Sequence, residues 1–147
     1  MVGVLYREGI TGIHMNPSLS EVLQALQDSW SIDSTDDPEN WNPSNPSRGQ
    51  CGMSSLIIND YFGGKLVLWK VFVGEEQDGV HYSNELPDGT PFDSTGDQFW
   101  DTEELKEPLS FERPSELPKN GADRYLRLSD LVRSKLEREQ EEKSIST

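Results

Sequence analysis

The single cysteine of the chain is a candidate nucleophile because of the residues around it. Cys51 follows Arg48-Gly49-Gln50 and precedes Gly52 in a chain of 147 residues. The apolar spacing that starts here is helical, which predicts the thiol in the first turn of a helix. Free backbone N–H groups and the helix dipole favour thiolate over thiol at that position, and the small neighbours leave room for a substrate. Judged without its position, a lone cysteine is more often a small buried hydrophobic residue.

A thiolate nucleophile needs a general base, and two histidines are available. His14 belongs to an N-terminal segment without a clear structural pattern. His81 falls on a predicted strand that follows the cysteine helix, so it is the better candidate. The alternative for His81 is an imidazole in the core or on the surface that has no chemical role.

An imidazole base is oriented by an acceptor on its second ring nitrogen, and Asp93 is the candidate acceptor. The segment Leu86-Pro-Asp-Gly-Thr90 is typical of a three-residue hairpin loop whose glycine adopts the left-handed conformation. This loop pairs its flanking residues, so that Ser83 faces Asp93 further along the strands. His81 and Asp93 then share one face as diagonal neighbours. A two-residue Asp-Gly turn would put them on opposite faces, and the alternative for Asp93 is a solvated carboxylate at a strand end.

Weaker roles fall to two neighbours of these residues. Asn84 is a rival for orienting His81, on the other side of the strand. Gln50, or the backbone N–H of Cys51, could donate to an oxyanion. A metal site built from Cys51, His81 and His14 has too few ligands at recognisable spacing, so no metal or other cofactor is expected.

Helices are predicted on both sides of a sheet region in the sequence. Helical spacing of apolar residues indicates helices over residues 18–30, 50–61 and 123–143. The second of these ends at Gly63-Gly64 and carries Cys51 at its start. The length of the chain predicts one domain over residues 1–147.

The sheet is predicted as an antiparallel meander after the cysteine helix, which gives an α+β order. Its strands are expected over residues 65–73, 80–86 and 90–94. Polar residues between the first two strands predict a turn over residues 74–79. Loops are predicted over residues 31–48 and over the proline-rich residues 101–122.

The charge of the chain limits its possible partners. The sequence has 27 acidic and 13 basic residues, for a formal net charge of -14. This charge repels nucleic-acid phosphates and anionic membrane surfaces, so neither is an expected partner. The single cysteine excludes an intramolecular disulfide and favours a reducing, cytoplasmic location. No run of 18 apolar residues or basic leader pattern is present, so neither membrane insertion nor secretion is expected.

Two resemblances add to this interpretation. The order Gly49-Gln50-Cys51, then His81, then Asp93 resembles the core of transglutaminase-like cysteine enzymes, in which a Gly-Gln-Cys helix start precedes a His strand and an Asp strand. The resemblance implies a papain-like or transglutaminase-like fold. In such a fold, N-terminal helices pack on an antiparallel sheet and a C-terminal helix covers an outer surface.

A second resemblance covers the middle half of the chain. The segments Trp41-Asn-Pro-Ser-Asn-Pro-Ser-Arg-Gly-Gln-Cys51, Ile58-Asn-Asp-Tyr-Phe-Gly-Gly64 and His81-Tyr-Ser-Asn-Glu-Leu-Pro-Asp-Gly89 are similar to the YunG-like family of small uncharacterised bacterial proteins. Family members tend to have His-Tyr-Trp-Asn and Asp-Leu-Thr where this chain has Ser83 and Ser94. The resemblance implies a fold and a site, and the missing Trp would change the shape of the pocket.

These observations favour a cysteine-dependent amide hydrolase or acyltransferase acting on a peptide or protein amide. Cys51 would attack the amide carbon, His81 would protonate the leaving amine, and Asp93 would hold the imidazole. Peptidase, glutamine deamidase and isopeptidase activities fit the three residues equally well. The alternative is a non-enzymatic acidic interaction protein, of inhibitor or immunity type, that keeps the fold. An enzyme needs a reactive and accessible Cys51, whereas a binding protein does not.

Overall fold

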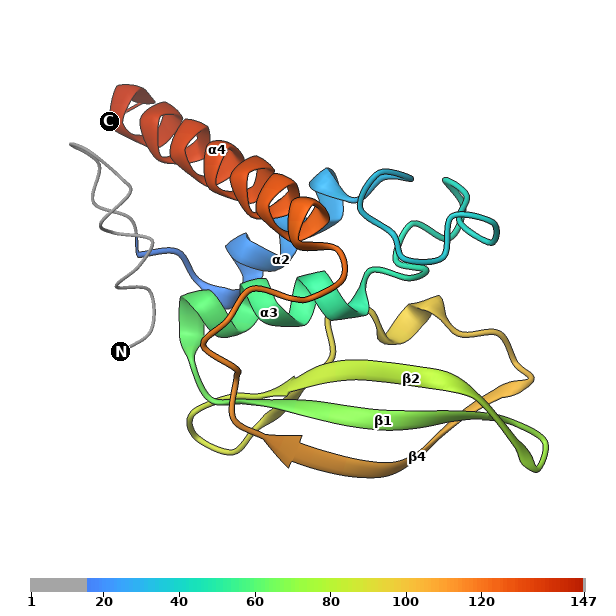
Figure 1. The fold of residues 1–147 in the computed structure, drawn as a ribbon. Helices are drawn as coiled ribbons and strands as arrows, with labels where there is room; N and C mark the ends of the chain where they lie inside the picture. Colours follow the sequence, from blue (N-terminus) through green and yellow to red (C-terminus); the bar gives the residue numbers. More distant parts are fainter. Residues whose placement is uncertain (1–15, 147) are drawn as a thin grey trace.

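The computed structural model describes residues 16–146 and combines helices with one antiparallel sheet (Figure 1). The helices are α2 (Leu19–Ser29), α3 (Cys51–Phe62), the short 3-10 helix η1 (Gly96–Gln98) and α4 (Ala122–Ser146). The strands are β1 (Lys65–Val73), β2 (Glu76–Glu85), β3 (Pro91–Phe92) and β4 (Glu103–Phe111). The three α-helices gather on one side of the sheet, with α3 next to it and α4 farther away (Figure 1). The predicted α+β class is confirmed.

The sheet has the strand order β3-β2-β1-β4, and all neighbouring strands are antiparallel. Helix α3 is attached to β2 by Asn84, whose side-chain Nδ2 donates to the carbonyl of Ser55 at 2.9 Å. The C-terminal end of α3 is closed by Asn59, which donates to the carbonyls of Gly63 and Gly64. These contacts fix α3, and therefore its first residue Cys51, relative to the strand that carries His81.

Helix α2 begins where its sequence predicts a cap. The Ser18 hydroxyl accepts from the backbone of Glu21, and the Glu21 carboxylate accepts from the backbone of Ser18. This reciprocal pair satisfies backbone donors that a helix start leaves open. The apolar face of α2 then packs against α3 and α4, and Trp30 Nε1 donates to Ser54 Oγ of α3 at 2.9 Å.

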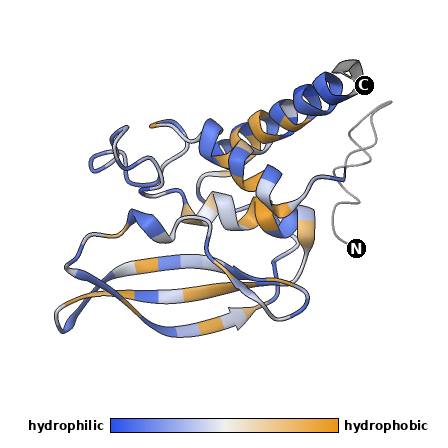
Figure 2. Ribbon diagram, turned by 180° about the vertical axis from the view of Figure 1, so that it is seen from behind, coloured by the Kyte–Doolittle hydropathy of each residue, from blue (hydrophilic) through white to orange (hydrophobic). Residues whose placement is uncertain are grey.

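The main core lies between the helices. Figure 2 shows apolar residues on the facing sides of the helices, whereas the outer side of α4 is hydrophilic. The fully buried side chains in this cluster are Val22, Leu26, Ile57, Ile58, Leu128 and Val132. Among residues 16–146, no helix combines the length and the apolar composition needed to cross a lipid bilayer.

The hairpin between β2 and β3 has the predicted loop and register. Leu86 N–H donates to the Thr90 carbonyl at 2.8 Å, and Gly89 has a φ of 88°, in the left-handed region. The next pairs along the strands are Glu85 with Pro91 and Asn84 with Phe92. The three-residue loop is therefore confirmed, and with it the alignment that brings Asp93 toward His81.

The prediction of a loop over residues 101–122 is wrong, because residues Glu103–Phe111 form strand β4. β4 is an edge strand that pairs only with β1, so Pro108 can occupy a position that needs no ladder hydrogen bond. The pairing shifts between Leu68 and Lys70, and Glu107 opposite this region has a φ of 55°. Proline, charge and this irregularity conceal the strand in the sequence.

Three further boundaries differ from the prediction. β2 begins at Glu76, so the turn predicted over residues 74–79 is shorter than expected. The sequence does not reveal this strand start because the end of the hairpin is exposed and carries no apolar pattern. β3 contains two residues, since Asp93 already leaves the sheet to hydrogen-bond with Thr95. The C-terminal helix spans Ala122–Ser146, slightly longer than the predicted 123–143.

Candidate active site

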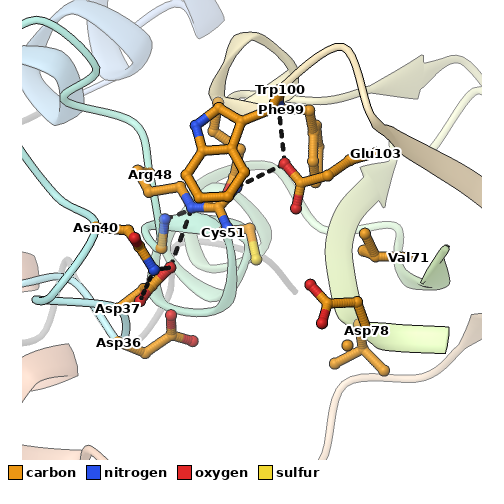
Figure 3. A pocket seen from close by; sticks show the side chains of 14 residues that line it. Asp36, Asp37, Asn40, Arg48, Cys51, Val71, Asp78, Phe99, Trp100 and Glu103 are labelled. Atoms are coloured by element: carbon orange, nitrogen blue, oxygen red, sulfur yellow. Dashed lines mark hydrogen bonds and ion pairs between the residues drawn. The ribbon is translucent and has the colours of Figure 1, made fainter. Parts of the chain in front are cut away.

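Cys51 is the first residue of α3, and its side chain faces a pocket. The residue before it, Gln50, is the N-cap and makes no side-chain capping bond, so the helix N-terminus keeps open backbone donors. Cys51 is 6% exposed and lines a pocket of about 520 Å³, into which its sulfur points (Figure 3). A pocket of this size is within the range of small-molecule and peptide side-chain sites. The thiol is thus buried on most sides and open to one cavity.

His81 is held by Asp93, as the hairpin register requires. His81 Nε2 lies 2.6 Å from Asp93 Oδ2, and the His81 side chain is 1% exposed. The second ring nitrogen, Nδ1, is buried and has no oxygen or nitrogen hydrogen-bond partner among residues 16–146. The edge of the ring packs against Phe99, with centroids 4.7 Å apart. Asp93 therefore fixes one nitrogen of the imidazole and leaves the other for a different group.

Asp93 and Cys51 both influence the charge of His81. Burial alone would lower the pKa of His81, but the hydrogen bond with Asp93 and then the interaction with Cys51 raise it. The net result is a pKa of about 9, compared with an ordinary value of 6.5. With a pKa of about 9, the imidazole carries a positive charge at neutral pH.

A chain of hydrogen bonds connects the Asp93 side of the site to the Cys51 side. Asp93 Oδ1 accepts from the backbone of Thr95 at 3.1 Å. Gln98 Nε2 donates to Thr95 Oγ1 at 2.9 Å, while Gln98 Oε1 accepts from the backbone of Gly49 at 3.0 Å. Because Gly49 is two residues before Cys51, Gln98 couples the position of Cys51 to that of the Asp93 carboxylate.

Gly49 itself allows the approach of the preceding loop. Its φ is 75°, and a Cβ added there would overlap Thr35 Oγ1 and come within 2.9 Å of Asp37 N. Thr35 Oγ1 in turn donates to the Arg48 carbonyl at 2.6 Å. The loop over residues 31–48 is consequently attached to the start of α3, as an ordered segment.

The pocket has one wall built around Arg48. Its guanidinium pairs with Asp37 at 3.0 Å and with Glu103 at 2.8 Å, and it lies 4.1 Å from the centre of the Trp100 ring. Asp36 and Asp78 reach the pocket from opposite sides (Figure 3). Four carboxylates therefore line the pocket beside one guanidinium, which is already paired. This excess of negative charge disfavours anionic ligands.

The two weaker candidates are placed differently from Cys51 and His81. Gln50 is fully buried next to Cys51, and its Nε2 donates to the Ser31 carbonyl at 3.1 Å. Asn84 is also fully buried and donates to α3, where it holds the helix on the sheet. His14 lies outside the described residues. Among residues 16–146, no three His, Cys, Asp or Glu side chains gather in a way that could hold a metal ion.

Sequence reasoning missed the residues that connect and enclose the site, namely Gln98, Thr95, Phe99, Trp100 and Glu103. One signal was present, because Asp93-Ser-Thr95 is a sequence in which an Asp side chain accepts from the backbone two residues later. The others contact residues about 18 to 55 positions away in the chain, and no local pattern reports such contacts.

Comparison with known proteins places the chain in a family. A family model described as YunG protein matches residues 18–137. The chain is 33% identical, over 81 residues, to a curated relative called uncharacterized protein YunG from Bacillus subtilis (strain 168). The match covers 55% of this chain and 63% of the relative, so it spans less than two thirds of that protein. No solved structure matches. The chain belongs to the YunG family.

Proposed function

We propose that the chain is a cysteine-dependent amide hydrolase or acyltransferase with a papain-like or transglutaminase-like arrangement of Cys51, His81 and Asp93. The observation that carries this proposal is the state of His81. One ring nitrogen is hydrogen-bonded to Asp93, and the other is buried without an oxygen or nitrogen partner among the described residues while the ring interacts with Cys51. Cys51 lines the pocket, His81 interacts with Cys51, and Asp93 holds His81, which is the order of nucleophile, base and orienting residue that such an enzyme needs.

The reaction begins with attack of the Cys51 thiolate on the carbonyl carbon of an amide. The C–N bond then breaks, and the His81 imidazolium transfers its proton to the leaving amine. This leaves an acyl group in thioester linkage to Cys51 and a neutral imidazole. His81 next removes a proton from water, whose oxygen attacks the thioester. The C–S bond breaks and releases a carboxylic acid, which restores the Cys51 thiolate and the His81 imidazolium. An amine in place of water would give transamidation.

The start of α3 supplies donors for the oxyanion that forms during attack. The backbone N–H of Cys51 belongs to the first helical turn, where the helix offers no internal acceptor. Gln50 uses one N–H of its side-chain amide to bind the Ser31 carbonyl, and a primary amide has a second N–H. We assign these two donors to the oxyanion.

Acyl-enzyme formation tests the proposal. The protein is mixed with the p-nitrophenyl ester of an N-acetyl amino acid, and both p-nitrophenol release and the intact mass are followed. We expect a burst with one acyl group on Cys51, no acylation in Cys51→Ala, and acylation slowed about a hundredfold or more in His81→Gln. His14→Gln, the matched loss of the other histidine, should acylate like the parent.

Equal acylation rates in the parent and in His81→Gln would contradict the proposal. They would show that Cys51 reacts as an ordinary thiol without a base. That result would favour the alternative of an acidic interaction protein that retains the fold.

A further inference from the structure

A second pocket, of about 540 Å³, adjoins the N-terminus of α3. It is bounded by α3 and the start of α4, by strands β1, β2 and β4, and by the segment that connects β4 to α4. Asp36 lines both pockets, and Gly52 lines the second one directly after Cys51 lines the first. The two cavities are therefore neighbours that meet at the start of the cysteine helix.

The lining of the second pocket differs from that of the acidic pocket. Its wall is formed largely by apolar and aromatic side chains, which include Met53, Leu56, Leu66, Tyr82, Phe111 and Leu117. A cavity with mainly apolar walls and a few polar groups is typical of a site that binds an apolar group and orients it. The acidic pocket, by contrast, is suited to a polar or basic group.

Tyr82 and Gly52 connect this pocket to the nucleophile. A Cβ added at Gly52 would meet only Tyr82 Cδ2, at 4.0 Å, so the glycine leaves open space beside Cys51. Gly52 and Tyr82 both line the apolar pocket, so this open space is continuous with it. A group attached to a carbonyl at Cys51 can therefore reach the apolar pocket over Gly52.

The direction of the substrate follows from the position of the base. The leaving amine must depart toward His81, whose ring packs against Phe99, a residue of the acidic pocket. The acyl part then extends the other way, over Gly52. We propose that the apolar pocket binds the side chain on the acyl side of the scissile bond, and that the substrate is a peptide amide with a large apolar residue there. This inference rests on the proposed function, because it takes Cys51 as the nucleophile.

Peptidyl chloromethyl ketones test the proposal, because the Cys51 sulfur displaces chloride only after the acyl-side residue is bound. Four N-acetyl reagents with Leu, Phe, Ala or Glu next to the ketone are compared on the full chain. Each rate is divided by the iodoacetamide rate of the same variant. We expect Leu and Phe to react about tenfold or more faster than Ala and Glu.

Two substitutions locate the preference. Gly52→Phe fills the pocket beside Cys51 and should remove the preference, whereas Gly52→Ala, the matched control, should keep it. Leu117→Glu introduces a charge at an exposed wall residue, so it leaves the core intact and should reduce the preference severalfold. Leu117→Glu keeps the test valid if Gly52→Phe does not fold.

The outcomes separate this inference from the proposed function. If iodoacetamide labelling depends on His81 but all four reagents react alike, the apolar pocket does not bind the acyl side chain and the nucleophile stands. If the preference for Leu and Phe survives both Gly52→Phe and Leu117→Glu, another surface binds the acyl-side residue and the inference is wrong. Labelling that does not depend on His81 would overturn both proposals.

Discussion

His81 Nε2 lies 2.6 Å from Asp93 Oδ2, and this contact joins β2 to the residue that directly follows β3. The contact settles which nitrogen of the imidazole is bound to the carboxylate. It leaves Nδ1 buried without a hydrogen-bond partner among residues 16–146. One hydrogen bond between β2 and the residue after β3 therefore determines how the imidazole is oriented.

The first prediction concerns the dependence of stability on pH. The pKa of His81 is raised from 6.5 to about 9 in the folded chain. Folding therefore stabilises the protonated imidazole, and this stabilisation is fully present below pH 6.5 and is lost as the pH rises through about 9. Asp93→Asn should reduce the free energy of unfolding most near pH 6.5, where the imidazole of the parent is fully protonated. Urea denaturation of the parent and the variant at several pH values measures the difference, which should shrink toward high pH.

The cause of this pH dependence is checked by NMR. In His14→Gln, His81 is the one remaining histidine, so its ring signals can be followed directly. We expect a titration midpoint near 9, and Asp93→Asn should lower it by about one to two units because burial then opposes protonation. A stability difference that stays constant with pH, or a midpoint near 6.5, would show that Asp93 does not control the charge of His81.

The second prediction concerns Gly49, which lies two residues before Cys51. Gly49→Ala should lower the free energy of unfolding by about 3 kcal/mol or more. The alanine would have to adopt the left-handed φ of Gly49, and its Cβ would overlap Thr35. Gly74→Ala is the matched control, since Gly74 also has a positive φ but a Cβ there meets nothing within 4 Å. This control should cost about 1 kcal/mol. Equal losses in thermal or urea denaturation would show that the loop over residues 31–48 is not packed against Gly49.

The third prediction concerns the acidic pocket. Cys51 should react faster with a cationic trimethylammonium methanethiosulfonate than with an anionic sulfonate methanethiosulfonate. The ratio of the two rates should be about fivefold or more above the same ratio for free cysteine. Asp78 reaches the pocket, so Asp78→Asn should reduce this ratio, and high salt should reduce it in the parent. Glu141→Gln changes the same net charge at an exposed position of α4 and should have no effect. A ratio equal to that of free cysteine would show that the carboxylates do not control access to the thiol.

The helices and the hairpin of the site could be predicted because their signals are local. Capping residues, helical spacing and the Leu86-Pro-Asp-Gly-Thr90 loop act within a few residues, and the loop alone determines that Asp93 approaches His81. Strand β4 could not be predicted, because an edge strand with half-exposed residues and Pro108 has no clear alternation.

The surroundings of the three candidate residues depend on contacts between distant parts of the chain. Gln98 bonds to Gly49, and Glu103 pairs with Arg48. Both partners are polar residues in segments that carry no hydrophobic pattern, so only the folded chain shows that they enclose Cys51. The sequence could thus predict the candidate triad and could not predict the walls of its pocket.

The rate of Cys51 alkylation by iodoacetamide as a function of pH, in the parent and in His81→Gln, tests the central claim most directly. If Cys51 and His81 form a nucleophile and base pair, the folded parent is labelled quickly at neutral pH. The variant should then become reactive only near roughly pH 8.5, the range of a free thiol. Superimposable profiles for the two proteins, both with the ordinary thiol range, would contradict the pair and with it the proposed enzyme.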